Sequence, residues 1–320
     1  MSNARTATRS RTIVWFTVAI VFVVLAGAML YEPDRSVASL LSRWAPPPSV
    51  FRPIDGLAVH LRDEGPQADS TPIVLLHGTS ASLHTWEGWA SAMTVGRRVV
   101  RVDLPGFGLT GPDTAGDYRI ERYTRFVVAL LDSLRIPRAD LAGNSLGGEI
   151  AWHVAARHPA RVRRLVLVDP AGFPIEAESM PIAFRIAREP ALAWMMTRTL
   201  PRPVVTASVR NVYGNPTLVR DSLIDRYYEL TLRAGNRAAL PARFAQMRDG
   251  ADTLLLTGIG APTLLVWGGR DRLIPPSHAA RFHRLLRNAR LLVYPELGHV
   301  PHEEDATRTA RDAMAFLNAR

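Results

Sequence analysis

A single serine stands among glycines in the stretch "GNSLGG", where Gly143 to Gly147 have the pattern G-x-S-x-G. Glycines on both sides let the chain pass through a turn that larger side chains would block, which leaves the serine hydroxyl exposed. The apolar run before the stretch predicts a strand, and the run after it predicts a helix whose positive end favours developing negative charge. Ser145 is therefore a candidate nucleophile, although ordinary strand-to-helix corners also carry glycines.

A serine hydroxyl is nearly inert at neutral pH, so Ser145 needs a histidine base and a carboxylate that orients it. After such a turn the expected order along the chain is nucleophile, acid, base. Asp271 follows the apolar run "TLLVWGG" and His299 follows "RLLVYPELG", so both lie in predicted loops in that order. The alternative acid is Asp169, which ends "LVLVD", and the alternative base is His302. We favour His299 because it directly follows a glycine in the turn, and Asp271 as its partner.

Acyl transfer also needs N–H donors for the oxyanion that forms in the transition state. The N–H of Leu146, the residue after the nucleophile, is the first expected donor. The second is expected from the loop after "PIVLLHG", where Thr79 is the first choice and Ser80 the alternative. We interpret His77, at the start of this loop, as a residue that braces the loop by a hydrogen bond.

The elements that must position these residues alternate along the chain. Short apolar runs such as "PIVLLHG" and "VRRLVLVD" predict strands, and "LAVHLR" alternates like an edge strand. Runs with helical spacing, such as "YRIERYTRFVVALLDSL", lie between them. This order predicts an α/β fold with a mostly parallel central sheet and helices on both faces. The alternation stops at Gly172 and resumes near residue 259, and the helical character of the region between predicts a lid.

The N-terminus predicts a membrane segment. Three arginines precede the uncharged run Ile13–Leu30, which at 1.5 Å per residue spans roughly 27 Å of bilayer. We expect the N-terminus in the cytoplasm and the rest of the chain on the extracytoplasmic side. The alternative is a signal peptide cleaved near Ala26-Gly27-Ala28, which would give a secreted or periplasmic protein. The predicted divisions are a cytoplasmic tail (1–12), a transmembrane helix or signal peptide (13–31), a linker (32–51), the core (52–171 and 259–320) and a helical lid (172–258).

Composition narrows the class of function. The formal net charge is +10, but the basic residues are spread over the chain and interleaved with acidic ones, so nucleic acid is not an expected partner. All 39 basic residues are arginines, which excludes Schiff-base lysine chemistry and a P-loop. The chain has no cysteine, which excludes a thiol nucleophile and a cysteine-ligated metal. We expect no cofactor and no metal, and the oligomeric state stays open.

Five stretches together resemble the α/β-hydrolase superfamily in its lidded serine-hydrolase branch: "HGTSASLHTWEGW", "DLPGFGLT", "GNSLGG", "GGRDRLIP" and "ELGHVPHEE". The resemblance covers Arg52 to the C-terminus and is weakest in the lid. It implies a triad of Ser145, Asp271 and His299 and an acyl-enzyme that water releases. It also implies a small carboxylic ester as substrate. Met and Trp side chains in the lid suit lipophilic or monoacylglycerol-like esters, although packing of the lid on the core explains them more simply.

Three other functions stay open. The first is carbon-carbon bond hydrolysis of meta-cleavage products from aromatic rings, because those hydrolases share the "GNSLGG" form. They typically carry Trp after the catalytic histidine, where this chain has Val300. The second is an acyltransferase or cofactor-free haloperoxidase, in which another nucleophile intercepts the acyl-serine. The third is a non-catalytic ligand-binding protein on the same fold, a class that usually lacks a triad residue.

Overall fold

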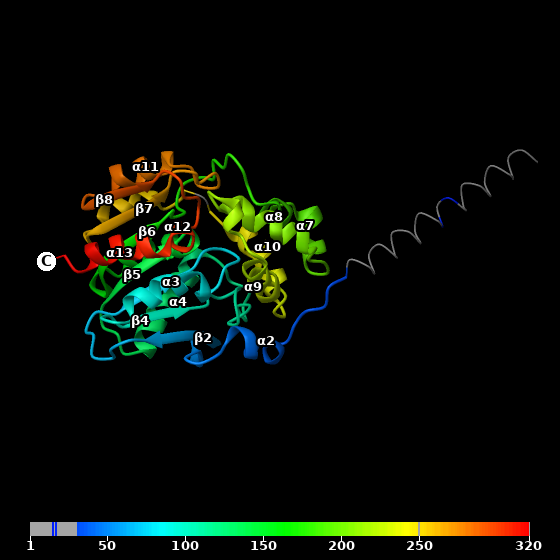
Figure 1. Ribbon diagram of the computed structural model, residues 1–320, viewed down its shortest axis with the longest axis horizontal. Helices are drawn as coiled ribbons and strands as arrows, with labels where there is room; N and C mark the ends of the chain where they lie inside the picture. The colour runs from blue at the N-terminus through cyan, green and yellow to red at the C-terminus, as the bar shows by residue number, and fades with distance from the viewer. Residues whose placement is uncertain (1–14, 16, 18–30, 249, 320) are drawn as a thin grey trace, which may run out of the picture.

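The computed structural model describes Trp15, Thr17 and residues 31–248 and 250–319. Apart from Trp15, Thr17 and Tyr31, the predicted transmembrane helix or signal peptide (13–31) lies outside the described residues, as does the predicted tail (1–12). Within the described part of the chain, no helix is both long enough and apolar enough to cross a bilayer. Figure 1 shows the sheet and its covering helices at the end that holds the C-terminus, and a separate group of helices at the opposite end.

Eight strands form one sheet, and their bounds are β1 (Val50–Ile54), β2 (Leu57–Glu64), β3 (Ile73–Leu76), β4 (Val99–Val102), β5 (Ala139–Asn144), β6 (Val162–Val168), β7 (Thr263–Gly268) and β8 (Ala289–Tyr294). Their order across the sheet is β1-β2-β4-β3-β5-β6-β7-β8. The pairs β1–β2 and β2–β4 are antiparallel, and all other neighbours are parallel. The predicted mostly parallel sheet is therefore confirmed.

The edge of the sheet differs from the prediction. The run "LAVHLR" forms β2, which lies between β1 and β4 and is mostly buried, so its assignment to an edge strand is wrong. The true edge is β1, whose residues are exposed except Ile54. Its sequence "VFRPI" contains Pro53, which cannot donate to a strand ladder and is tolerated at an edge.

Two layers of helices cover the sheet. The helices α3 (Glu87–Met93) and α13 (Ala306–Leu317) pack on one face, and α4 (Ile120–Ser133), α5 (Leu146–Arg157) and α11 (Ser277–Leu285) pack on the other. Successive strand side chains point to opposite faces, so β3 places Ile73 and Leu75 in the first layer and Val74 and Leu76 in the second. All four are fully buried, which explains why the strand is an unbroken apolar run.

Among the described residues, five α-helices lie between β6 and β7, in the region predicted as a lid, and we keep that name for them: α6 (Ile182–Arg188), α7 (Pro190–Met196), α8 (Arg202–Val212), α9 (Asp221–Thr231) and α10 (Asn236–Gln246). Pro181, Pro190 and Pro201 stand at the starts of the first three, where a missing N–H and a fixed φ favour helix initiation. The remaining elements are α2 (Val37–Trp44), α12 (Pro301–Glu304), and the 3-10 turns η1 (Leu83–Trp86), η2 (Pro159–Arg161), η3 (Pro216–Leu218) and η4 (Thr253–Gly258).

The residues predicted as a linker (32–51) pack against the lid instead of standing free of it. Helix α2 occupies part of this segment, and its Arg43 forms an ion pair with Asp225 of α9 at 2.7 Å. The indole N–H of Trp44 donates to Glu229 of the same lid helix at 2.6 Å. These contacts fix α2 to the lid, whereas the last two residues of the segment, Val50 and Phe51, belong to β1 of the sheet.

Candidate active site

Ser145 occupies a sharp turn between β5 and α5. Its φ of 53° and ψ of −115° lie in a region that side chains with a Cβ rarely adopt. A Cβ on Gly143 would lie 2.2 Å from the carbonyl oxygen of Gly147, and a Cβ on Gly147 would lie 2.1 Å from that of Leu76. The glycines predicted to make the turn are therefore required by close backbone approaches, and the turn places Ser145 at the N-terminus of α5.

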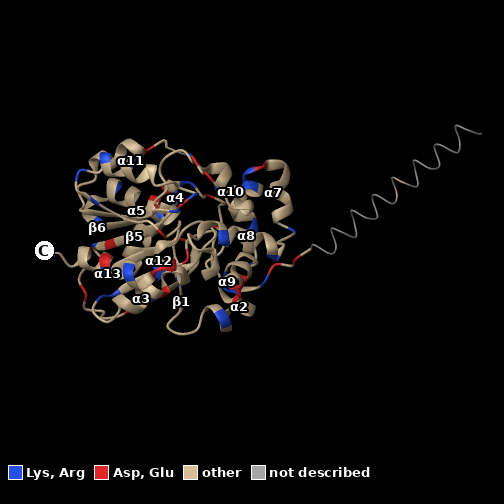
Figure 2. Ribbon diagram, turned by 45° about the horizontal axis from the view of Figure 1, so that its top comes forward, with Lys and Arg blue, Asp and Glu red and all other residues tan. Residues whose placement is uncertain are grey.

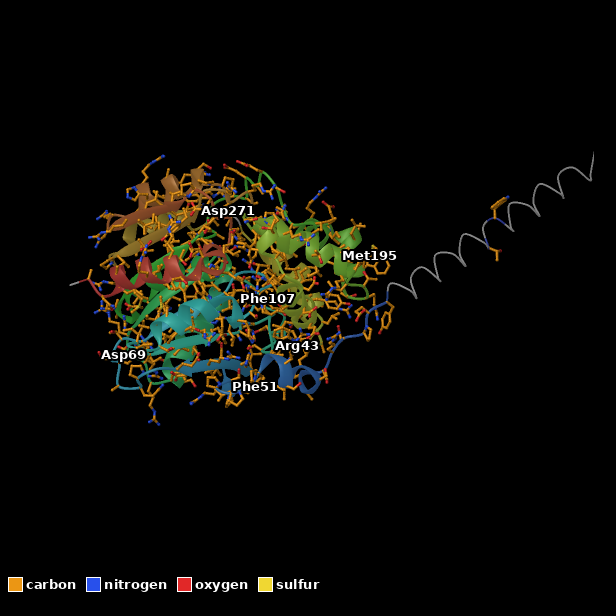
Figure 3. The ribbon with its side chains drawn as sticks, viewed as in Figure 1. Arg43, Phe51, Asp69, Phe107, Met195 and Asp271 are labelled. Atoms are coloured by element: carbon orange, nitrogen blue, oxygen red, sulfur yellow. The ribbon has the colours of Figure 1, made fainter. Side chains whose placement is uncertain are left out.

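Asp271 and His299 lie in the loops after β7 and β8, where the sequence predicts them, and they contact each other. The Nδ1–H of His299 donates to Oδ2 of Asp271 at 2.6 Å, and both side chains are buried. The other carboxylate oxygen of Asp271 accepts the N–H groups of Leu273 and Ile274 at 2.8 and 2.9 Å. With Nδ1 donating, Nε2 of His299 is left as the acceptor that a general base requires. Asp271 lies on the side of the core that faces the lid (Figure 3).

Ser145 and His299 line one cavity of about 750 Å³ beneath the lid, together with Thr79. The described residues that line it include no aspartate, glutamate or arginine. No direct hydrogen bond between the Ser145 hydroxyl and His299 occurs among the described contacts, and such bonds often tighten only when substrate is bound. Phe184 and Met196 of the lid also line this cavity, whereas Leu192, Trp194 and Met195 are exposed. Packing on the core thus explains only some of the apolar lid side chains.

The two predicted oxyanion donors lie near the nucleophile. Thr79 follows β3, Leu146 is the first residue of α5, and both border a second cavity of about 600 Å³ that also touches Ser145. Ser80, the alternative donor, lines the first cavity and has a φ of 60°. Glu149 and Arg243 face the second cavity and lie 3.4 Å apart. A charged pair therefore borders the second cavity, whereas the first is lined by uncharged groups and His299.

The structure separates the alternative histidines from the nucleophile. The Nδ1–H of His77 donates to the carbonyl oxygen of Gly78 at 2.7 Å, and its Nε2 accepts the N–H of Leu104 at 2.9 Å. This arrangement matches the predicted bracing role, and burial lowers the pKa of His77. His302 lies against Thr85, 3.1 Å from its hydroxyl, and burial lowers the pKa of His302 well below its ordinary value. Neither histidine lines the cavities that contain Ser145.

Asp169, the alternative acid, is a buried neighbour of Asp271. It accepts the N–H of Gly268 at 2.9 Å, and burial together with the charge of Asp271 raises its pKa well above the ordinary value. Two adjacent carboxyl groups cannot both ionise cheaply, so the charge of Asp271 favours the neutral form of Asp169. Asp169, Asp271 and His299 offer ligand atoms within 4.8 Å of one another, which is the arrangement among the described residues that could hold a metal ion. Oδ2 of Asp271 accepts the hydrogen bond from His299, whereas Oδ2 of Asp169 is buried without a hydrogen-bond partner among the described residues.

Two further residues, neither of which is predicted from sequence to have a role, hold the loop of His299. The side-chain amide of Asn144 donates to the carbonyl oxygens of Val168 and His299 at 3.1 and 2.9 Å, which ties the nucleophile turn to the loop of the base. Glu304 accepts the N–H of Gly298 at 2.6 Å and that of Gly214, which lies between α8 and α9 of the lid, at 2.9 Å. The position of Asn144 beside Ser145 could have signalled its role, but Glu304 stands in an acidic run that resembles a solvated surface.

The chain belongs to the α/β-hydrolase superfamily, and it is a hydrolase of that fold. The family model described as "alpha/beta hydrolase fold" matches residues 71–306. The chain is 31% identical to a 2-hydroxymuconate semialdehyde hydrolase of Pseudomonas putida, over 82% of this chain and 91% of that protein.

Two solved structures extend the comparison. A membrane phospholipase A, described as a bacterial virulence factor, is 26% identical with a TM-score of 0.74, and the match covers 98% of this chain and all of that one (100%). A meta-cleavage product hydrolase of Pseudomonas fluorescens IP01 is 24% identical with a TM-score of 0.73, over 84% of this chain and 97% of that one. The second likeness supports the fold alone.

Proposed function

We propose that this protein is a serine hydrolase that cleaves carboxylic esters of apolar acids. Ser145 attacks the ester carbonyl, while Nε2 of His299 takes the hydroxyl proton and then delivers it to the leaving alcohol. Asp271 holds the imidazole in the tautomer that this requires. The N–H groups of Thr79 and Leu146 stabilise the oxyanion, and water then attacks the acyl-serine and releases the acid. The arginine-flanked apolar run alone supports placing this chemistry outside the cytoplasm.

One observation carries the proposal, namely the uncharged lining of the cavity that contains Ser145 and His299. An ionised substrate would lose its hydration on entering this cavity and would find no group of opposite charge there. Burying an unpaired charge in an apolar site costs free energy. A neutral ester loses little on entering, and its apolar chain gains from contact with the lid side chains. Lipophilic esters are thus the substrate class that this cavity accommodates best.

Carbon-carbon bond hydrolysis is the second candidate, and the curated relatives support it better than ester hydrolysis. The relative from P. putida is named for a muconate semialdehyde, which carries a carboxylate. Arg243 of this chain lines the second cavity together with Ser145, and its guanidinium could pair with such a carboxylate. Its existing pair with Glu149 at 3.4 Å, and Val300 in place of Trp after His299, favour the ester.

The test compares both substrate classes on one preparation of the full chain. Hydrolysis of p-nitrophenyl esters from acetate to dodecanoate is measured beside the loss of absorbance of a ring-cleavage dienoate. Preference for medium or long esters supports the proposal, and faster turnover of the dienoate assigns the second function instead. A fluorophosphonate probe should label the wild type but not Ser145→Ala. Ser133→Ala is the matched control, because Ser133 is exposed at the end of α4.

A further inference from the structure

Large apolar side chains of the lid lie in solvent on α6 and α7. The exposed fractions are 41% for Ile182, 43% for Leu192, 64% for Trp194 and 40% for Met195. Figure 3 shows Met195 at the outer edge of the lid, at the end of the molecule away from the C-terminus. Isolated apolar residues are normal on a protein surface, but several on adjoining helices indicate an interaction site. We name these four residues the lid patch.

Basic residues surround the lid patch. Arg185 and Arg188 lie on α6, Arg198 lies just after α7, and all three are exposed. Glu189 is the single acidic residue between Ile182 and Thr199. Figure 2 shows basic residues in blue beside α7. Tryptophan and apolar side chains bordered by arginine are typical of surfaces that enter the headgroup region of anionic membranes.

Tyr31 and Glu32 also lie close to the end of α7, next to the lid patch. Tyr31 forms an antiparallel bridge with Thr199, and the N–H of Glu32 donates to the carbonyl oxygen of Arg198 at 3.0 Å. Tyr31 directly follows the uncharged run Ile13–Leu30 in the sequence. Asp34 also pairs with Arg237 of α10 at 2.6 Å, which helps to fix this approach. The apolar run therefore joins the domain three residues after the end of α7.

We propose that the lid patch is a docking surface for a lipid bilayer with anionic headgroups. The apolar side chains enter the headgroup region, the arginines pair with lipid phosphates, and the run that precedes Tyr31 joins the domain on the same side. Met196 and Leu200, which adjoin the patch in sequence, line the cavity of Ser145. If the proposed ester hydrolysis holds, a lipophilic substrate then reaches the serine from the bilayer through the lid; the docking itself does not depend on that function.

Single-cysteine labelling tests the docking, because the chain has no native cysteine. The full chain with Trp194→Cys carries an environment-sensitive fluorophore and is reconstituted in vesicles of phosphatidylcholine and phosphatidylglycerol. The control is Val95→Cys. Val95 is 89% exposed and lies just after α3, outside the lid. At position 194 we expect a blue shift and at least about twofold quenching by brominated acyl chains, with neither at position 95.

Two outcomes overturn the proposal. One is a label at position 194 that responds to lipid no more than the label at position 95. The other is a response that grows with the protein-to-lipid ratio and is accompanied by energy transfer between copies, which would assign the patch to a second copy of the chain. Neither outcome depends on catalysis, so failure of the docking and failure of the proposed ester hydrolysis are distinguishable.

A variant that adds negative charge to the lid patch provides the functional readout. Leu192→Glu combined with Trp194→Glu and Met195→Glu should lower hydrolysis of an ester embedded in vesicles by roughly tenfold or more. Hydrolysis of a water-soluble ester and fluorophosphonate labelling should stay within about twofold of wild type, since these side chains lie outside the cavity. Leu254→Glu is the matched control, because Leu254 is 78% exposed in η4. Equal loss on both substrates, or on neither, contradicts docking through the patch.

Discussion

Asp271→Asn should nearly abolish turnover, for a reason that the hydrogen bonds of Asp271 make specific. Oδ1 of Asp271 accepts two backbone N–H groups, so the amide oxygen of an asparagine must take that position. The amide NH₂ then faces Nδ1 of His299, where the carboxylate now accepts a hydrogen bond at 2.6 Å. Because NH₂ can only donate, the imidazole must carry its proton on Nε2 and cannot accept one from Ser145. Such a tautomer reversal costs about 10⁴-fold in kcat, which is about 5.5 kcal/mol of transition-state stabilisation.

The assay is steady-state hydrolysis of the best p-nitrophenyl ester at pH 7 to 8, with KM expected to stay near the wild-type value. Asp169→Asn is the matched control. Burial and the charge of Asp271 favour the neutral form of Asp169, and an amide is a neutral group of similar shape, so we expect a loss of no more than about fivefold. A kcat of Asp271→Asn within tenfold of wild type would refute the reasoning. Equal losses in the two variants would show that Asp169 shares the role of the acid.

Three further predictions concern Gly147 in the nucleophile turn, the hydrogen bonds of Asn144 and the buried His153. Gly147→Ala should lower both the melting temperature and fluorophosphonate labelling, because the added Cβ would lie 2.1 Å from the carbonyl oxygen of Leu76; an unchanged melting temperature contradicts the clash. Asn144→Ala should cost about 1–3 kcal/mol in urea unfolding, because it leaves two buried carbonyl oxygens without this donor, and Asn144→Asp should not restore stability. Burial lowers the pKa of His153 to about 4, so the unfolded state binds the proton first as pH falls from about 6.5 towards 4. The unfolding free energy should decline over that window, and His153→Gln should weaken the decline.

The places of the three proposed triad residues could be predicted from sequence because each of them follows its own strand. Ser145, Asp271 and His299 are marked by local turn chemistry, and parallel strands bring their carboxyl ends to one edge of the sheet. The closeness of Asp169 to Asp271 follows from the same rule, since β6 and β7 are neighbours. Which of the two acids contacts His299 depends on distances that strand order does not supply, so it required the structure.

Other features could not be predicted, because they depend on contacts between distant parts of the chain. Strand β1 was not predicted, because its first residues, Val50 and Phe51, were assigned to the linker (32–51), while β2 was placed at the edge because its apolar alternation resembles a half-exposed strand. Glu304 resembles a surface acid in the sequence. Only the folded chain brings the N–H groups of Gly214 in the lid and Gly298 in the His299 loop to its carboxylate. The packing of Arg43 on Asp225 joins residues 182 positions apart, and no local pattern signals it.

The contacts between residues 31–44 and the lid also determine which parts of the molecule can move together. The N–H of Arg35 donates to Leu232, and its carbonyl oxygen accepts the N–H of Ala234, just beyond α9. With the bridge from Tyr31 to Thr199, the segment 31–44 contacts the lid at the α7–α8 connection, at the α9–α10 connection and along α9, and we call this segment the strap. Opening of the lid would therefore carry this strap with it and bend the chain at the exposed prolines 46–48. A pull on the N-terminus would reach the lid before it reached the sheet, so the entrance to the cavity would respond to mechanical load.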